Sequence, residues 1–549
     1  MQRPLAGLTR KNVGRELLAG VTLVAIAIPL NIGYAQIAGL PPTAGLYALV
    51  VPTIVYALVV SSRQLVASPD AAAAALVASS IGGLAAAGSA DYATMALAQA
   101  IICGVMFILM SVFKLGFLAN FLSKPILIGF VGGLALDILV SQIAKMLGIR
   151  IDSGGEFVEK TIGLVTGLGT LNVWSLLISV GSIAILLIGR RLLAVVPWAL
   201  VVMIVATILV VVTDADGAGV AVLGEVPAGP PQLTWPMLSW TQWLALVPSA
   251  LALTMVTVAE GLLVIRSYAE KRHYPTSPNR DLLAFGVGNI AAGASGSFAM
   301  GSSTSRTAAM DQAGSRTQLP SFVLAGGTLL LLLFGTALLA EIPSPAIGAI
   351  VGVAVLPLLG IREFRELWRL DRFEFWIGVV CFLATLFIGA IPGILVAFVL
   401  ALVNMAKRAA NPAIDVLAAD GEPSGSLLAD APAGSVTAPG VVVVRMAAPL
   451  FFANGDVFGT AVKSAVTSAR DSQDVHHVVI DLEAVTDADV TGAEAFAALR
   501  DWLDTSQVSL GFSRLRADAR PRLERLGIIR DGDAVYPTNR AAVAALTEK

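Results

Sequence analysis

Long apolar segments are the feature that most constrains the fold of this chain. Segments of about 20 residues, the length that crosses a bilayer as a helix, recur from Leu17 to Met405. These segments do not alternate polar and apolar residues, as the strands of a membrane barrel would. Charged residues make up only 13% of the chain and hydrophobic residues 56%, which agrees with an integral membrane protein. We therefore expect an all-α, polytopic membrane domain.

The apolar segments predict about fourteen spans, and the basic residues test that count. The spans are expected near residues 17–38, 44–61, 69–84, 93–113, 121–147, 173–189, 193–213, 243–266, 282–296, 304–318, 320–340, 345–361, 374–391 and 392–408. Lys and Arg collect in cytoplasmic loops. They follow the even-numbered spans, as at Arg63, Lys114, Arg191 and Lys407, whereas residues 214–242 contain none. This pattern predicts a multi-pass protein of the cell (inner) membrane with a cytoplasmic N-terminus and no cleavable signal peptide.

Two predicted spans, the third and the tenth, are too short to cross a bilayer comfortably. Each follows a polar break, Ser-Pro-Asp at residues 68–70 and Ser-Thr-Ser-Arg at residues 303–306. Seven spans lie in each half of the domain, so the two breaks are at corresponding positions. This arrangement predicts a 7+7 inverted-repeat transporter with its binding site at the bilayer midplane. Two helix N-termini and Arg306 would face that site, which favours an anion.

The composition changes after the last span. Residues 411–440 are rich in Pro, Gly, Ala and Asp, which indicates a linker after a membrane domain at residues 1–410. Apolar runs at residues 441–445 and 477–482 are typical of buried strands, and helix-like stretches follow them. Alternating strands and helices predict a small cytoplasmic α/β domain at residues 441–549.

Several motifs resemble those of a known family. They read IPLNIGYA at residues 28–35, SSRQ at 61–64, PDA at 69–71, GVGNI at 286–290, SRTA at 305–308, PLFFAN at 449–454 and DLEAVT at 481–486. By these motifs the chain is identified as a member of the sulfate permease (SulP) family of anion transporters, whose animal relatives include pendrin and prestin. Its C-terminal segment is similar to a STAS domain.

The resemblance implies a core bundle (helices 1–4 and 8–11) that moves against a gate bundle (helices 5–7 and 12–14), usually in a homodimer. It also implies a substrate site between helices 3 and 10, lined further by helices 1 and 8. The residues that this site would contain are Asn31, Tyr34, Ser68, Asp70, Ala71, Thr304, Ser305 and Arg306. Glu260, on helix 8, is the candidate for proton coupling.

The sequence departs from the family pattern at four positions. Leu30 stands where many relatives have glutamine, and Asn31 beside it projects about 100° away around the helix. Ser68 replaces a common glycine. Val264, four residues after the helix-8 acid, replaces the threonine of sodium-coupled relatives, which disfavours a sodium site. Val490 occupies the phosphorylatable serine position of STAS domains, so we expect no phosphorylation switch there.

Four charged residues in the spans have both functional and structural interpretations. A carboxylate inside a membrane must be neutral, paired with a cation or in contact with water. Glu260 is therefore a proton carrier, a sodium ligand or a static partner of Arg306 or a lysine. Asp70 either caps helix 3 or helps select the anion. Arg306 either grips the anion with two parallel hydrogen bonds or braces helices 8 and 10. Asp137 is a cavity-facing or packing residue of the gate bundle.

The leading functional hypothesis is a secondary active, proton-coupled transporter that moves a small inorganic anion or carboxylate by alternating access. The alternatives are an uncoupled anion channel or exchanger, and a nucleobase permease on the same fold. We expect no enzyme, because no nucleophile–base constellation, phosphate loop or metal cluster is evident. We expect H⁺ as the coupling ion, with Na⁺ disfavoured, and no cofactor or metal. The expected partners are the anion, the bilayer, a second copy and a cytosolic partner of the STAS domain, but no nucleic acid.

Overall fold

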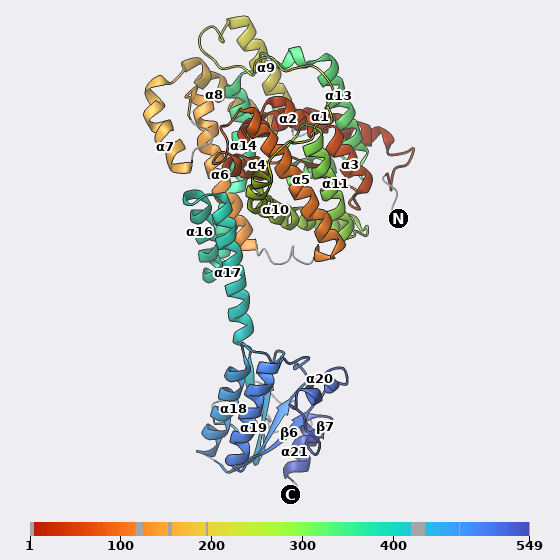
Figure 1. Cartoon of the computed structure of the whole chain (residues 1–549), viewed down its shortest axis with the longest axis vertical. Coiled ribbons are helices and arrows are strands. Elements are labelled where there is room, and N and C mark those ends of the chain that lie inside the picture. The colour runs from red at the N-terminus through yellow and green to blue at the C-terminus, as the bar shows by residue number, and fades with distance from the viewer. Residues whose placement is uncertain are drawn as a thin grey trace. The chain divides into compact units, whose positions relative to one another are not determined.

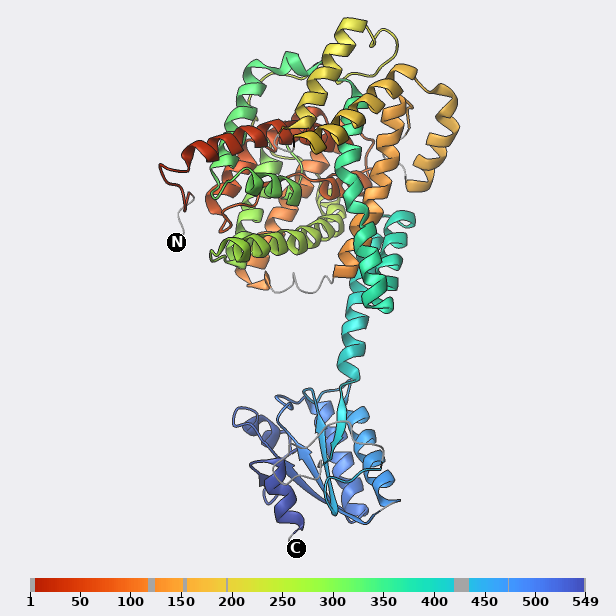
Figure 2. The same ribbon diagram turned by 180° about the vertical axis from the view of Figure 1, so that it is seen from behind.

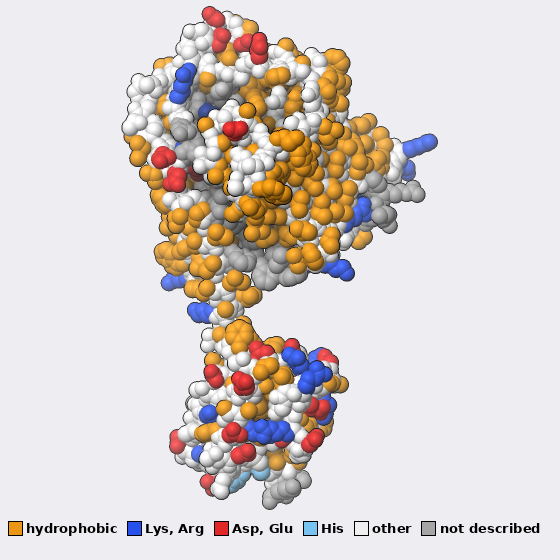
Figure 3. Space-filling view, in the orientation of Figure 1, with side chains coloured by type: hydrophobic (Ala, Val, Ile, Leu, Met, Phe, Trp, Pro, Cys, Tyr) orange, Lys and Arg blue, Asp and Glu red, His pale blue; other side chains and the backbone are white. Residues whose placement is uncertain are grey.

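The chain forms two compact units, Met1–Ala401 and Leu402–Lys549. The structure is a computed structural model that describes residues 5–116, 124–151, 156–193, 196–418, 434–471 and 473–547. The first unit is almost entirely helical, and the second combines a sheet with helices (Figure 1). Hydrophobic side chains cover most of the visible face of the first unit, whereas charged side chains gather on the second (Figure 3). This contrast is expected of a membrane domain joined to a water-exposed domain.

Each of the fourteen predicted spans contains a helix of the first unit or of its border. The helices are α1 (Val13–Ile37), α2 (Pro42–Tyr47), α3 (Val51–Val59), α4 (Ala71–Ile81), α5 (Ala90–Val112), α6 (Lys124–Leu147), α7 (Phe157–Thr166), α8 (Val173–Leu192), α9 (Trp198–Thr213), α10 (Trp240–Arg272), α11 (Pro278–Ala294), α12 (Thr304–Gln312), α13 (Leu319–Phe334), α14 (Ser344–Val355), α15 (Ile361–Leu370), α16 (Arg372–Phe387) and α17 (Ala390–Ala410). Short 3₁₀ helices are η2 (Gly167–Thr170), η3 (Thr336–Leu339) and η4 (Leu356–Leu359). From behind, α1 (red) and α10 (olive green) cross this unit as two long helices (Figure 2).

Continuous helices account for only part of the predicted span count. Among the described residues, six helical stretches are long and apolar enough to cross a bilayer, and a seventh results if the pair bent by 116° at residues 157–189 is one span. The helices α4, α9 and α13 are apolar but shorter. Helix α7 was not predicted, because its ten residues include Glu159 and Lys160 and are too few for a span.

The third and tenth spans are broken, as predicted. Helix α4 has 11 residues and α12 has nine. A two-residue strand precedes each helix, β1 (Ala67–Ser68) and β2 (Gly301–Ser302), and the two strands pair in antiparallel register. The sequence did not predict these strands, because two residues carry no strand periodicity. Their pairing places the N-termini of both half-helices at one short ribbon.

Small residues let the membrane helices approach closely. A Cβ on Gly104 of α5 would collide with the carbonyl of Gly286 on α11, and a Cβ on Gly293 with the carbonyl of Leu97. Helices that pack in a bilayer use such positions because van der Waals contact replaces the hydrophobic effect there. The α5–α11 pair is therefore a tightly joined unit beside the broken helices.

The segment after α12 is anchored by one buried carboxylate. Asp311, with a side chain only 4% exposed, pairs with Lys271 at 2.9 Å, Arg272 at 2.7 Å and Arg316 at 3.2 Å. The amide of Gln64 donates a further hydrogen bond of 2.9 Å to it. The carboxylate thereby joins α10, α12 and the loop before β1, and so fixes the C-terminal end of the tenth span.

The second unit contains a five-stranded sheet. Its strands are β3 (Ile414–Leu417), β4 (Gly440–Met446), β5 (Val475–Asp481), β6 (Ser509–Ser513) and β7 (Ala534–Tyr536), paired in that order. Only β3 is antiparallel to its neighbour. Its helices are α18 (Gly455–Arg470), α19 (Val490–Thr505), α20 (Arg520–Arg525) and α21 (Asn539–Thr547).

Successive valine side chains of β4 point to opposite faces of the sheet and pack into different hydrophobic cores. Val442 and Val444 face the core formed with α18 and α19, while Val441 and Val443 pack with α21. The predicted strands and the helix after residue 490 are confirmed. The structure also places β3 inside the predicted linker, of which residues 419–433 lie outside the described ranges. Val490 is exposed in the first turn of α19.

Replacing Asp311 should destabilise the membrane domain. In Asp311→Asn the three cationic side chains lose their shared partner, and we expect the free energy of unfolding to fall by about 3 kcal/mol. This is the low end of the range for a broken buried ion pair, because the three cationic side chains are partly exposed to water. Thermal unfolding of the purified chain in detergent measures this as a lower melting temperature. The control Glu270→Gln removes an exposed carboxylate that pairs only with Arg266 among the described contacts, and should leave the melting temperature unchanged.

Candidate functional site

The two half-helices are joined beyond the β1–β2 ribbon. The backbone amide of Ser303 donates to the carbonyl of Val66 at 3.0 Å. In return, the amide of Val66 donates to the hydroxyl of Thr307 at 3.0 Å. The first turn of α12 is therefore held against the strand that leads into α4.

Side chains cap both helices at this ribbon. The carboxylate of Asp70 accepts a 2.7 Å hydrogen bond from the amide of Ala73, and the hydroxyl of Ser303 accepts one of 3.4 Å from the amide of Arg306. Within the described chain, the first-turn amides of Thr304 and Ser305 have no protein acceptor, as is usual at a helix start. Each helix start carries about half a positive charge. Two partial positive charges thus lie close together inside the membrane domain.

Arg306 connects the two half-helices. Its Nε donates to the hydroxyl of Ser303 at 2.7 Å, and its Nη2 donates to the carbonyl of Pro69, directly before Asp70, at 2.6 Å. Its guanidinium carbon lies 5.7 Å from the ring centre of Tyr34, which is a cation–π contact. Arg306 is 1% exposed, and its Nη1 has no hydrogen-bond partner. A buried donor without an acceptor is costly, and this nitrogen can still donate a hydrogen bond.

Two carboxylates, those of Asp70 and Glu260, lie near the β1–β2 ribbon. Gly301 leaves room for Asp70, because a Cβ at residue 301 would collide with the Asp70 carboxylate. Glu260, on α10, interacts electrostatically with Asp70, and the neighbouring Gly261 packs beside Ser302 of β2. In the part of the chain that the structure describes, no carboxylate lies within ion-pair distance of Arg306. No lysine or arginine lies within ion-pair distance of Glu260 among these residues either. The structure thus shows neither the Glu260–Arg306 ion pair nor an α10–α12 brace through Arg306.

The site has an accessible edge and a buried wall. Thr304 and Ser305 are exposed, and Asp70 and Glu260 are partly exposed. Arg306 and Tyr34 are buried behind them. An anion that reaches the start of α12 would meet hydroxyl groups and free amides first and the guanidinium second.

The remaining predicted residues form the buried wall. The hydroxyls of Ser68 and Ser302 are buried without partners, one on each paired strand. Ala71, the first residue of α4, is also buried. Asn31 donates to the carbonyl of Ala27 in its own helix at 2.8 Å, and its side-chain oxygen has no partner. The structure therefore gathers the predicted residues of the two half-helices, while the Asn31 amide is turned along α1.

Asp137 lies apart from this site. It pairs with Lys160 of α7 at 2.8 Å, a contact that the sequence did not predict. The sequence did not reveal this pair, because α7 was not predicted as a helix. Among the described residues, no group of three or more His, Cys, Asp and Glu side chains could hold a metal ion.

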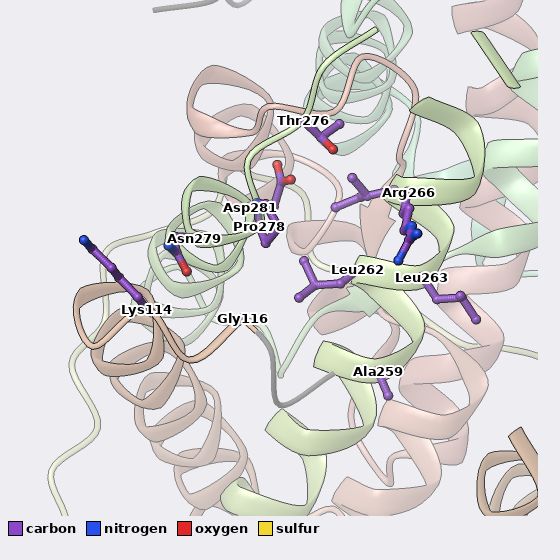
Figure 4. Close-up of a pocket in the computed structure, with 11 residues that line it drawn as sticks. Lys114, Gly116, Ala259, Leu262, Leu263, Arg266, Thr276, Pro278, Asn279 and Asp281 are labelled. Carbon is purple, nitrogen blue, oxygen red and sulfur yellow. The ribbon is translucent and has the colours of Figure 1, made fainter. Parts of the chain in front are cut away.

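A cavity of about 580 Å³ lies elsewhere in the first unit. It is bounded by the end of α5, by α10 and by the start of α11, with Lys114, Arg266 and Asp281 among its lining residues (Figure 4). Ala259 also lines it, but Arg306, Tyr34 and Asp70 do not. Its size alone does not make it the site, because the converging charges and helix ends are at the ribbon.

Comparison with known proteins identifies the family. The model of the sulfate permease family matches residues 14–381, and that of the STAS domain matches residues 435–542. The chain belongs to the sulfate permease family. A probable sulfate transporter of Mycobacterium tuberculosis is 33% identical over 97% of this chain and 95% of its own length. The chloroplastic sulfate transporter 4.1 of Arabidopsis thaliana is 28% identical over 94% of this chain and 77% of its own length.

Solved structures share the fold. SLC26A9 matches with a TM-score of 0.89 and 22% identity over 98% of this chain and 91% of its own. The transmembrane domain of the cyanobacterial bicarbonate transporter BicA matches with a TM-score of 0.63 and 22% identity, over 72% of this chain and 98% of its own. The predicted polytopic α-helical domain with a C-terminal STAS domain is confirmed, and the protein is a multi-pass anion transporter of this family.

Crowding the Asp70 carboxylate should impair transport. In Gly301→Ala the new methyl group displaces Asp70 from the start of α4, so we expect anion uptake into proteoliposomes to fall about tenfold, the effect of one lost hydrogen bond to a charged group. The matched control is Gly326→Ala, where a Cβ meets open space. Uptake that falls equally in both variants would contradict a specific role for the space at Gly301.

Proposed function

We propose that this chain is a proton-coupled secondary transporter that carries a small inorganic anion or carboxylate by alternating access. The substrate binds between α4 and α12. The observation that carries the proposal is the Nη1 of Arg306, a buried donor without an acceptor at the meeting point of two helix N-termini. An anion there would accept hydrogen bonds from the guanidinium and from the free amides at the start of α12.

The charges around this position explain why a proton would accompany the anion. Two half-charges from the helix ends and one guanidinium oppose the carboxylates of Asp70 and Glu260. If both carboxylates are ionised, the positive and negative charges cancel and an anion gains little. Protonation of Glu260 leaves one net positive charge for the anion. Release of that proton on the other side of the membrane would then expel the anion.

Glu260 suits this role better than Asp70. The Asp70 carboxylate is engaged in capping α4 and is confined by Gly301. Glu260 is partly exposed and has no hydrogen-bond partner among the described contacts, so it can exchange a proton with water. It also lies four residues from Val264, which offers no oxygen to a sodium ion.

Oxyanions are the substrates that the site suits best. Nη1 of Arg306 and the free amides at the start of α12 can donate to different oxygens of one sulfate, bicarbonate or carboxylate, which a spherical ion cannot offer. Relatives named as sulfate transporters make sulfate the first candidate to test. Counterflow in proteoliposomes with labelled sulfate, bicarbonate, chloride and dicarboxylates, with and without a pH gradient, would identify the substrate.

The proposal includes an orientation and an assembly. We infer that the N-terminus and the STAS domain are cytoplasmic, in the inner membrane of the cell, because the basic residues follow the even-numbered spans. We also infer a homodimer in which the STAS domain contributes to assembly and regulation and offers a surface to a cytosolic partner. Cysteine labelling from each side and mass measurement in detergent test these points.

Loss of the Arg306 guanidinium should weaken substrate binding. In Arg306→Lys the charge remains but the Nη1 donor and the hydrogen bond to Pro69 are lost, so we expect the half-saturating anion concentration to rise roughly 10- to 100-fold. Initial uptake rates over a range of anion concentrations measure it. Arg10→Gln, which removes an exposed cation near the N-terminus, is the control. An unchanged half-saturating concentration in Arg306→Lys would remove Arg306 from the binding site.

Neutralising Glu260 should separate exchange from coupling. Glu260→Gln fixes the side chain in the neutral state that favours anion binding, so anion exchange should continue. Uptake driven by a proton gradient should cease, because no proton would cross with the anion. Glu270→Gln, on the exposed end of the same helix, should keep both activities. Concentrative uptake by Glu260→Gln would show that Glu260 is not the proton carrier, and uncoupled exchange by the unmodified chain would support the exchanger alternative.

A further inference from the structure

Two cationic side chains line a small cavity beside the second half of α4. The cavity lies between α1, α4, α6 and α7, and Lys145 and Lys160 both line it. Its volume is about 20 Å³, enough for one particle of the size of water. Asp137 is the carboxylate among its lining residues, so two ammonium groups face one negative charge.

The lysines are not fully engaged by protein acceptors. Lys160 donates to both carboxylate oxygens of Asp137, at 3.1 and 2.8 Å. Lys145 donates to the side-chain oxygen of Gln36, a neutral group, at 3.1 Å. An ammonium has three donors, so each lysine keeps capacity for another acceptor. The Asp137 charge is balanced by Lys160, and the charge of Lys145 has no carboxylate partner among the described contacts.

A buried amide provides an independent observation at the same cavity. Gln142 is 1% exposed and lines the same cavity, and neither atom of its amide group has a hydrogen-bond partner. A buried amide without partners costs several kcal/mol unless something in the cavity satisfies it. An anion beside Lys145 would accept from the amide nitrogen of Gln142.

The position of the cavity relates it to the Arg306 site. Ala75 and Ala78 of α4 form one of its walls. They lie four and seven residues after Ala71, so they share one face of the helix with the residue that starts it. The rise of a helix puts them about 6 and 10 Å along the axis from Ala71. A face of methyl groups therefore runs from the Arg306 site to the lysine cluster.

The geometry points to a second anion site, formed by Lys145, Lys160 and Gln142, which holds a small anion at the end of the domain where α1 and α6 finish. By the predicted topology this is the outer end. The hydrogen bond between Lys145 and Gln36 closes the site in this conformation, because it joins α1 to α6. Movement of α1 and α4 away from α6 would release Lys145 and open the cavity to anions larger than chloride.

Chloride binding to the full-length chain tests the second site, with the excess linewidth of the ³⁵Cl resonance as the measure. In Arg306→Gln, which removes the proposed substrate contact, chloride-dependent broadening should persist at a reduced level. Adding Lys145→Gln should raise the dissociation constant of the remaining broadening about tenfold. Arg150→Gln, which removes an exposed cation just beyond α6, should leave it unchanged.

The outcomes separate this proposal from the proposed function. If Arg306→Gln alone abolishes all chloride-dependent broadening, the second site does not exist. If Arg306→Gln changes nothing while Lys145→Gln abolishes it, the lysine site stands and chloride does not bind at Arg306; the uptake kinetics of Arg306→Lys then decide the proposed substrate site separately. Gln142→Leu keeps every charge and should weaken the remaining broadening in the Arg306→Gln background even if Lys145→Gln does not fold. Lys145→Arg should retain the remaining chloride-dependent broadening. Loss of the broadening in Lys145→Arg would overturn a site that depends on charge.

Discussion

The structure of the transport site depends on one guanidinium that is hydrogen-bonded across two interrupted helices. Arg306 belongs to α12, yet one of its nitrogens donates to the carbonyl of Pro69, the residue that leads into α4. A buried cation is tolerated only when its donors are satisfied, and here Ser303, Pro69 and the ring of Tyr34 provide most of that compensation. The remaining donor, Nη1, has no protein acceptor. The same side chain thus holds the two half-helices together and, in the proposed mechanism, donates to the anion.

The sequence predicted those parts of the site that depend on local signals. The polar breaks before α4 and α12 follow from residue type and spacing, and the structure confirms them. Of the two interpretations of Asp70, the structure shows the helix cap. The sequence did not predict the β1–β2 pairing or the hydrogen bond from Arg306 to Pro69, because these contacts join residues that are far apart in the chain. The lysine cluster was missed for the same reason. Asp137 was recognised as a buried acid, but its partner Lys160 lies on a helix that the sequence pattern did not reveal.

In the proposed mechanism the charges around the anion are close to balance, and this balance would make transport controllable. A strongly positive pocket would hold an anion too tightly to release it, and a neutral one would bind it only weakly. With Asp70 confined at a helix start and Glu260 partly exposed, one proton on Glu260 would switch the pocket between neutral and singly positive. The same logic applies at the lysine cluster, where Asp137 offsets one of two ammonium groups and leaves a single positive charge.

Helix α4 presents alanine at its first five positions, and these residues are all buried. Side chains on packed helices normally form ridges that lock into the grooves of their neighbours. A surface of methyl groups has almost no ridges, so a neighbouring helix meets little steric resistance to sliding along it. The alanine run therefore gives a neighbouring helix a surface along which it can slide without repacking its side chains.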